Sequence, residues 1–270
     1  MSDKLNALKA LIRRFHRAVV AFSGGADSAF VLRVCSDTIG NRNVIAVTAQ
    51  SETYTAAELE YAKDFARETG VEHAVLATEE LGDERFSENS PVRCYYCKLH
   101  FYEKVRAFAD ARGIRAIFDG SNRDDEKDHR PGRNAAKERG VISPLIETGF
   151  TKSDVREHSK AMGLPTWNRP SNPCLASRVP YGQRITKEKL AAIEKAESFL
   201  RCNGFRIVRV RHHDSIARIE LDPGEMPRFF TDSLHQKTSE YFKDLGFAYA
   251  ALDICGYRTG SMNEVLGDRT

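Results

Sequence analysis

Long apolar runs are missing from this sequence. Of its 270 residues, 41% are hydrophobic and 29% charged. No stretch approaches the ~20 consecutive apolar residues of a membrane span. The N-terminal segment MSDKLNALKALIRRF carries charges throughout a helical pattern, so it is unlike a secretory signal. These absences predict a cytoplasmic location and no membrane partner.

A large excess of charge of one sign is missing too. The chain has 41 lysines and arginines against 38 aspartates and glutamates, for a net charge of +3. Proteins that bind nucleic acid through its phosphates carry a basic excess or a basic face. Nucleic acid is therefore not an expected partner.

Cysteine is sparse, with six in the chain, and a second C-x-x-C pair is absent. Without a secretory signal, these residues are expected to be reduced thiols, metal ligands or catalytic groups rather than disulfides. Cys94 and Cys97 form the one C-x-x-C, which alone fits half a zinc site, a redox pair or no site. Cys35 is expected to be a small core residue, and Cys202 and Cys255 have no spaced partner.

Short β-branched runs alternate with helical patterns through the first two thirds of the chain. Such alternation is typical of an α/β fold, in which helices cover both faces of a doubly wound parallel sheet. The predicted strands are residues 17–22, 44–48, 71–76, 115–118 and a short one near residue 141, and the predicted helices include 55–70, 96–112 and 153–162.

The pattern changes at residues 166–184, a segment with several prolines and no periodicity, which predicts a loop and domain hinge. Two consecutive strands then lie between helices, which indicates a smaller C-terminal α+β domain. The expected domains are residues 1–182 and 183–270. The elements expected in the second are helix 187–200, strands 205–211 and 216–221, helix 226–245 and strand 248–254.

A glycine-rich loop directly follows the first predicted strand and opens a helix. Two glycines let the backbone approach an oxyanion, and the backbone amides and helix N-terminus direct positive charge to it. Two serine hydroxyls add donors, and a carboxylate beside a phosphate suggests an intervening Mg²⁺. The loop lacks the Gly-Lys-Ser/Thr of a Walker A motif and the G-x-G-x-x-G dinucleotide pattern. Its residues are Ser23, Gly24, Gly25, Ala26, Asp27 and Ser28.

The segment AFSGGADS resembles the loop of the PP-loop ATP pyrophosphatases, which include GMP synthetase, NAD synthetase, argininosuccinate synthetase and tRNA thiolation enzymes. The resemblance implies an adenine-nucleotide alpha-hydrolase-like sheet, ATP cleaved between its α- and β-phosphates, and pyrophosphate held in this loop. DGSNRDD, after the fourth strand, is similar to a second nucleotide-binding motif of these enzymes. A capped turn explains this motif equally well. Its candidate residues are Gly120, Ser121, Asn122 and Asp125.

Cys174 differs from the other cysteines because it lies in the irregular segment NRPSNPCLASRVPYG, where a core thiol is not expected. With Cys94 and Cys97 it would supply three thiolates, and three ligands leave one metal position open. A cluster with three cysteine ligands would leave one iron free to carry hydrosulfide. These three cysteines are therefore candidate metal ligands.

Further motifs extend over nearly the whole chain, namely RCYYCK, DHRPGRNAA, GLPTWNRPSNPCLASRVPYG, VRVRHH, ARIEL and GYRTGSMNEVL. Together they resemble the LarE family. The resemblance implies an enzyme that adenylates a pyridinium biscarboxylic acid mononucleotide with ATP and installs sulfur as a thiocarboxylate, for the nickel-pincer nucleotide cofactor. One form of the family sacrifices the sulfur of a cysteine, which would correspond to Cys174. In the other, three cysteines hold a [4Fe-4S] cluster, and the presence of Cys94 and Cys97 favours that form.

The C-terminal domain offers candidates for binding the phosphate of a mononucleotide. Arg209 and Arg211 alternate with valines, so they share one strand face, and paired guanidinium groups suit phosphate. Arg258, in GYRTGSMN, is a further candidate. The family resemblance favours Glu197 as the active-site carboxylate. The plainer interpretations are an exposed charged strand face for the arginines and a solvated helix position for Glu197.

Three other functions fit parts of the sequence. A tRNA thiolation enzyme of the PP-loop class also uses three cysteines, but the near-neutral charge and the lack of flanking zinc-finger pairs disfavour it. An amide-forming synthetase leaves the cysteines unexplained. A nucleotide-binding protein with structural zinc would bind ATP without releasing AMP. The expected partners are the pyridinium mononucleotide, a sulfide donor and further copies of the chain in a homo-oligomer.

Overall fold

The computed structural model describes residues 3–126, 131–170, 172–258, 260–262 and 264. Parts of the motifs that resemble LarE lie outside these residues, namely positions 128–130, 171, 259, 263, 265 and 266. The chain divides into two compact units. Unit 1 comprises Met1–Phe86 and Pro91–Asn172, and unit 2 comprises Ser87–Ser90 and Pro173–Thr270.

Unit 1 is built on a four-stranded sheet in the order β3-β2-β1-β4, in which every neighbouring pair is parallel. Phe118 also pairs with Ile142 in a single parallel bridge, where a short strand was expected. The strands are β1 (Ala18–Ala21), β2 (Val44–Gln50), β3 (Glu72–Ala77) and β4 (Ala116–Phe118). The helices are α1 (Asp3–Ile12), α2 (Ala26–Ile39), α3 (Ala56–Thr69), α4 (Glu84–Ser87), α5 (Arg93–Asp110), α6 (Gly132–Glu138), α7 (Pro144–Glu147) and α8 (Lys152–Ala161), with 3₁₀ turns at Asn41–Asn43, Glu80–Gly82 and Arg123–Glu126.

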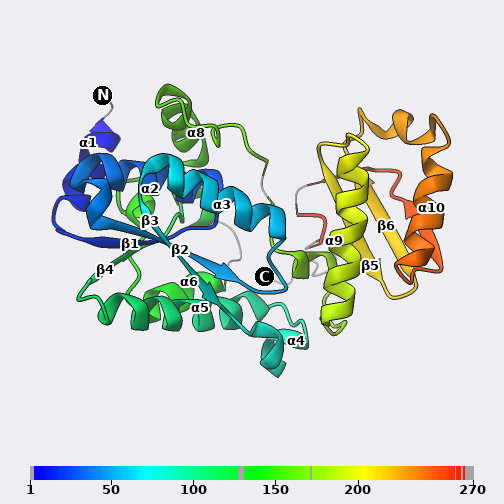
Figure 1. Cartoon of the computed structure of the whole chain (residues 1–270), viewed down its shortest axis with the longest axis horizontal. Helices are drawn as coiled ribbons and strands as arrows, with labels where there is room; N and C mark the ends of the chain where they lie inside the picture. Colours follow the sequence, from blue (N-terminus) through cyan, green and yellow to red (C-terminus); the bar gives the residue numbers. More distant parts are fainter. Residues whose placement is uncertain (1–2, 127–130, 171, 259, 263, 265–270) are drawn as a thin grey trace. The chain divides into compact units, whose positions relative to one another are not determined.

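Alternate strand residues pack into two apolar clusters on opposite faces of this sheet. Val20 and Phe22 belong to the cluster covered by α1, α2, α3 and α8. Val19 and Ile117 belong to the cluster covered by α5 and α6. Figure 1 shows α2 and α3 on one side of the strands and α5 and α6 on the other. Burial on both faces explains the unbroken hydrophobic runs of these strands, and the predicted doubly wound α/β fold is confirmed.

Unit 2 contains a three-stranded sheet in the order β5-β6-β7, where β5 and β6 are antiparallel and β6 and β7 parallel. Its core joins helix residues such as Leu200 and Phe242 to strand residues such as Val210 and Ile219. The smaller α+β arrangement of sheet and helices predicted for the C-terminal part is therefore present. Its elements are η4 (Leu175–Arg178), α9 (Lys187–Cys202), β5 (Val208–His213), β6 (Ile216–Leu221), η5 (Met226–Phe230), α10 (Leu234–Asp244) and β7 (Tyr249–Leu252).

The single helix predicted over residues 226–245 was wrong. The segment forms the 3₁₀ turn η5 and then α10, with an interruption between them. Asp232 and Ser233 have φ angles of 52° and 56°. Left-handed residues cannot continue a right-handed helix, and short polar side chains are among those that tolerate this conformation.

The described helices include none that is both long and apolar enough to cross a bilayer.

Candidate active site

The glycine-rich loop follows β1 at the carboxyl end of the sheet and leads into α2. Gly24 has a φ of 72°, which a residue without Cβ adopts readily. The buried Ser28 hydroxyl donates to the Gly25 carbonyl at 3.1 Å and lies 3.2 Å from the Ser23 hydroxyl. Tyr54, after β2, donates its hydroxyl to the Ser23 carbonyl. Within the described residues the start of α2 has no side-chain cap, so its backbone N–H groups can meet an anion.

Asp27, in the first turn of α2, forms an ion pair with Lys152, the first residue of α8. The Lys152 ammonium donates to Asp27 Oδ2. Asp27 Oδ1 is buried and has no hydrogen-bond partner among the described residues. A buried acceptor without a partner costs free energy, so Oδ1 is a position that a bound cation would stabilise. Sequence reasoning missed Lys152, because 125 residues separate it from Asp27.

The loop after β4 packs directly on the phosphate loop. A Cβ added at Gly120 would lie 2.7 Å from the backbone N of Ser28 and 2.9 Å from its Cα. Two backbones come this close only where one residue lacks a side chain. The strand order places β1 beside β4, and loops after such neighbouring strands of a doubly wound sheet form its ligand-binding crevice.

The DGSN segment is also a capped turn. Ser121 donates its hydroxyl to Asp119 Oδ2 at 2.7 Å, and the Asn122 backbone N donates to Asp125 Oδ2 at 3.0 Å. Asp119, Asn122 and Asp125 are buried. The capped turn is therefore confirmed, and it lies against the phosphate loop, while nucleotide binding by this motif stays a prediction.

Arg169, in the segment predicted to be a hinge, is a second cation at the phosphate loop. Its guanidinium pairs with Glu58 at 2.8 Å, lies 3.5 Å from the Gly24 carbonyl and stacks 3.5 Å from the centroid of the Tyr61 ring. Asn172 donates to the other oxygen of Glu58 at 2.7 Å. Arg169 and Asn172 therefore lie at the glycine-rich loop of unit 1, which the proline-rich sequence did not reveal.

Cys94 and Cys97 lie one turn apart at the start of α5. The Cys94 thiol is exposed and the Cys97 thiol half-buried, 3.7 Å from Glu80 Oε1. Glu80 itself is buried, and its Oε2 has no hydrogen-bond partner in the described part of the chain. Cys174 belongs to unit 2, whereas Cys94 and Cys97 belong to unit 1. Within the described residues, no three His, Cys, Asp or Glu side chains are grouped as a metal site.

The remaining cysteines differ in burial. Cys35 is fully buried on α2, as expected for a core residue. Cys202 and Cys255 are both exposed, so neither is a core residue of unit 2.

Glu197 is fully buried on α9, and the interpretation of a solvated helix position was wrong. Arg178 binds both carboxylate oxygens, at 2.8 and 3.1 Å, while the Val210 backbone N donates to Oε1 at 3.0 Å and Arg201 to Oε2 at 2.6 Å. Burial alone would raise the pKa of Glu197, but the charge and hydrogen bonds of Arg178, with Arg201 and Arg209, lower it overall. A carboxylate has about four lone-pair sites, and four donors fill them.

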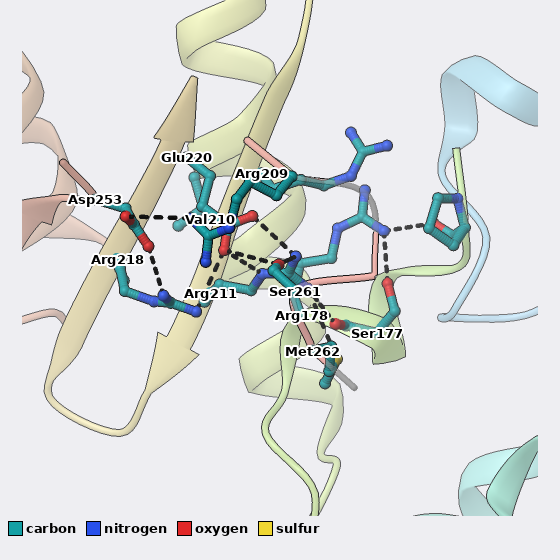
Figure 2. A network of polar contacts seen from close by, with 12 residues as sticks. Ser177, Arg178, Arg209, Val210, Arg211, Arg218, Glu220, Asp253, Ser261 and Met262 are labelled. Carbon is teal, nitrogen blue, oxygen red and sulfur yellow. Dashed lines mark hydrogen bonds and ion pairs between the residues drawn. The ribbon is translucent and has the colours of Figure 1, made fainter. Parts of the chain in front are cut away.

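The predicted phosphate-binding arginines have different surroundings. Arg211 pairs with Glu220 at 2.9 Å and also donates to Ser261 at 2.9 Å (Figure 2). Arg258 is half-exposed and pairs with Glu264 at 3.1 Å. Arg209 is buried, and its guanidinium carbon lies 5.3 Å from the centroid of the Tyr257 ring.

The pKa of Arg209 is lowered to about 10, first by burial and then by the charge of Arg178. The guanidinium still carries its charge near neutral pH, but in surroundings that disfavour it. An anion placed beside Arg209 would therefore be stabilised by that charge.

Comparison with known proteins decides the family. A model of the family "Queuosine biosynthesis protein QueC" matches residues 17–93, which hold β1, the glycine-rich loop and the strands β2 and β3. The pyridinium-3,5-bisthiocarboxylic acid mononucleotide synthase of Lactiplantibacillus plantarum is 38% identical over 266 residues, covering 98% of this chain and 96% of that protein. The chain belongs to the LarE family.

Two other proteins are similar to this LarE family member. The uncharacterized protein slr1717 of Synechocystis is 41% identical over 98% of this chain and 99% of its own length. The uncharacterized protein MJ0830 of Methanocaldococcus jannaschii is 26% identical over 90% of this chain and 91% of its own. The likeness therefore spans both units, and the family predicted from the motifs is confirmed.

Proposed function

We propose that this chain is an ATP-dependent sulfurtransferase that adenylates the carboxylate of a pyridinium mononucleotide and converts it to a thiocarboxylate in nickel-pincer nucleotide cofactor biosynthesis. The observation that carries the proposal is the near full-length identity of 38% to a curated pyridinium-3,5-bisthiocarboxylic acid mononucleotide synthase. The phosphate loop of unit 1 supplies the chemistry that an adenylating enzyme needs. AMP and pyrophosphate are the other products.

In the first step the substrate carboxylate attacks the α-phosphate of ATP, and pyrophosphate leaves. The backbone amides of residues 23–28 and the start of α2 face the leaving group, with Lys152 beside them. Asp27 Oδ1 would hold Mg²⁺, which offsets the charge of the phosphates. The DGSN turn keeps this loop in place, because Gly120 lies against its backbone.

In the second step a sulfur nucleophile attacks the acyl carbon of the adenylate, and AMP leaves. Cys174 is the residue we assign to sulfur delivery, and Arg209, Arg211 and Arg258 are the candidates for the substrate phosphate. Burial and the charge of Arg178 lower the pKa of Arg209, and a bound anion would act in the opposite direction.

A [4Fe-4S] cluster held by Cys94, Cys97 and Cys174 would supply hydrosulfide from its fourth iron. The two thiols of α5 lie one turn apart, one exposed and one half-buried, and suit two of the three ligand positions. Sulfide must then come from a separate donor. A reducing compartment keeps such thiols available, so the cytoplasm stays the predicted location.

Iron and acid-labile sulfide content tests this form of the enzyme. Protein purified without oxygen is expected to carry both, and the variant Cys94→Ala to carry neither, because two thiolates do not hold the cluster. The matched control is Cys202→Ala, which removes an exposed thiol outside the predicted ligand set. If the wild type lacks iron and Cys174 instead loses its sulfur by intact mass after turnover, the sacrificial form is correct. Zinc in place of iron would favour the structural-metal alternative.

Lys152→Met is expected to lower the rate of pyrophosphate release by about a hundredfold, as removal of a donor to developing charge does in other enzymes. Loss of the ammonium also leaves Asp27 without its ion-pair partner. The matched control is Lys160→Met on the same helix, where the ammonium lies over the Trp167 ring instead of at the loop. Single-turnover release of pyrophosphate measures both, and equal rates would remove Lys152 from the site.

The sequence alone also fitted a tRNA thiolation enzyme of the PP-loop class. It predicts tight tRNA binding that weakens steeply with salt, since phosphate contacts release counterions. Filter binding with bulk tRNA at two salt concentrations separates the two functions. Binding that is absent at physiological salt supports the mononucleotide substrate.

A further inference from the structure

Arg178 is a fully buried arginine that donates hydrogen bonds to the loop of Cys174. Its Nη1 donates to the backbone carbonyl of Pro173, to that of Cys174 at 3.1 Å and to the hydroxyl of Ser177 at 2.9 Å. Its side chain is 1% exposed, whereas Cys174 itself is half-buried. The backbone around Cys174 is thus held from inside the protein while its side chain keeps access to solvent.

Glu197 fixes the orientation of this arginine. Nε and Nη2 of Arg178 bind the two oxygens of Glu197, which leaves Nη1 as the atom directed at the Cys174 loop. The bidentate geometry sets the plane of the guanidinium group, because both Nε and Nη2 are hydrogen-bonded to the same carboxylate. Among the described residues four donors fill the lone pairs of Glu197, which leaves the carboxylate no position open for a substrate or metal.

The same network reaches the strand that carries the phosphate-binding candidates. Glu197 accepts the backbone N–H of Val210, which lies between Arg209 and Arg211 on β5. Arg211 in turn donates to the backbone carbonyl of Ser177, one residue before Arg178, at 2.7 Å (Figure 2). The loop of Cys174 is therefore tied to β5 at two points.

We propose that Arg178 is a positioning residue for sulfur transfer. With Glu197 as its anchor, it sets the backbone of Cys174 relative to the arginines of β5, so that the sulfur and the substrate phosphate keep a fixed separation. This inference rests on the proposed function, and it gives Glu197 a place in the reaction through Arg178 instead of direct contact with substrate.

A contribution to stability alone is the competing explanation. Buried ion pairs can often be replaced by neutral groups of similar volume without loss of stability, whereas removing one partner leaves a buried charge uncompensated. The double variant Arg178→Met/Glu197→Gln removes both charges and keeps an acceptor for the Val210 N–H. If Arg178 and Glu197 only stabilise the fold, this variant should transfer sulfur as the wild type does. If they position Cys174, the variant should fold but transfer sulfur more slowly than the wild type.

The experiment compares single turnovers of the double variant, of Arg178→Lys and of the holoenzyme, with ATP, substrate and sulfide. Lysine keeps the charge but has no planar fork to bind Glu197 and the loop together. In both variants the rate of pyrophosphate release, a reaction of unit 1, is expected to stay within about threefold of the wild-type rate. The ratio of thiocarboxylate to pyrophosphate is expected to fall at least about tenfold, because small misplacements of reacting groups slow a reaction by this factor or more. Lys189→Gln is the matched control, because Lys189 lies on α9 like Glu197 but pairs with the exposed Asp214 at 3.0 Å. It should keep the ratio within about twofold.

An unchanged ratio in both folded variants would overturn the proposal, and so would recovery of the ratio in the double variant. If the wild type itself forms no thiocarboxylate, the proposed function fails, and amide hydrogen exchange then decides the positioning role. The amides of residues 174–179 should exchange at least tenfold faster in the double variant than in wild type, with residues 208–221 unchanged, because loss of the Arg178 hydrogen bonds opens the loop locally. Equal exchange at 174–179 would refute the role of Arg178 independently of the chemistry.

Discussion

Asp27→Asn is expected to lower AMP release at least about a thousandfold, the largest effect of any substitution outside the cysteines. A carboxylate that holds a metal on the phosphates contributes several kcal/mol to the transition state, and each ~1.4 kcal/mol changes the rate tenfold. Asparagine keeps the volume of the side chain but removes its charge. The buried Oδ1 position would lose its attraction for a cation, and Lys152 would lose its ion pair.

The control for this variant lies on the same helix. Asp37→Asn removes a carboxylate of α2 that pairs with Arg33 on the surface, an interaction that contributes little to stability. AMP is measured with ATP in excess, with and without the pyridinium mononucleotide. Asp37→Asn should behave as wild type. Normal AMP release by Asp27→Asn would remove the assignment of this loop to the nucleotide.

Local sequence signals were enough to predict the sheet and the phosphate loop. The strands β1 and β4 are apolar runs that both faces bury, and the loop of residues 23–28 brings its strand, turn and helix together within a short segment. The family could also be predicted, because its motifs are spread over the chain and each can be read on its own. Boundaries moved by a few residues only, since propensity and capping act locally.

Residues that act through distant partners could not be predicted in the same way. Lys152 meets Asp27 across 125 residues and Arg169 meets Glu58 across 111, so neither pattern nor spacing points to them. Glu197 looks like one of several charged positions on a helix, and its burial depends on Arg178, which lies in an irregular segment. Arg178 lies within the motif GLPTWNRPSNPCLASRVPYG, but nothing in the sequence singled it out. Its contacts with a cysteine loop and a buried carboxylate appear only in the folded chain.

The interruption before α10 was the one error that the sequence could have exposed. Thr231, Asp232 and Ser233 are residues that favour turns and helix starts. The apolar spacing on both sides nevertheless fits one helix, and this periodicity outweighed the turn signal in the prediction.

Gly120→Ala is expected to damage the nucleotide site as a whole. The new Cβ would lie within 3 Å of the backbone N and Cα of Ser28 and 3.1 Å from the carbonyl carbon of Asp27. Backbone atoms cannot rotate away, so the turn after β4 or the start of α2 must move. Overpacking of this kind costs about 1–3 kcal/mol, and a displacement near 1 Å at a reacting group can lower the rate about a hundredfold.

Gly82→Ala is the matched control for Gly120→Ala, because it adds the same methyl group at a glycine that no other backbone approaches closely. Neither Gly82 nor Gly120 has a positive φ, so alanine is compatible with the backbone at both positions. A Cβ at Gly82 meets no heavy atom within 4 Å. The free energy of unfolding of Gly82→Ala should therefore stay within about 0.5 kcal/mol of the wild-type value. Thermal unfolding gives the stability of each variant, and pyrophosphate release gives its rate of adenylation.

The two measurements on Gly120→Ala distinguish displacement of the loop from general instability. A loss of 1–3 kcal/mol corresponds to a fall of roughly 2–12 °C in the melting temperature of a chain of this size, which leaves the protein folded at 25 °C. Adenylation should then be at least tenfold slower than in Gly82→Ala at a temperature where both are folded. If Gly120→Ala adenylates normally, the contact between the DGSN turn and the phosphate loop has no part in holding the nucleotide. If adenylation falls while stability is kept, α2 has shifted to admit the Cβ, and the position of its first turn is what the enzyme needs.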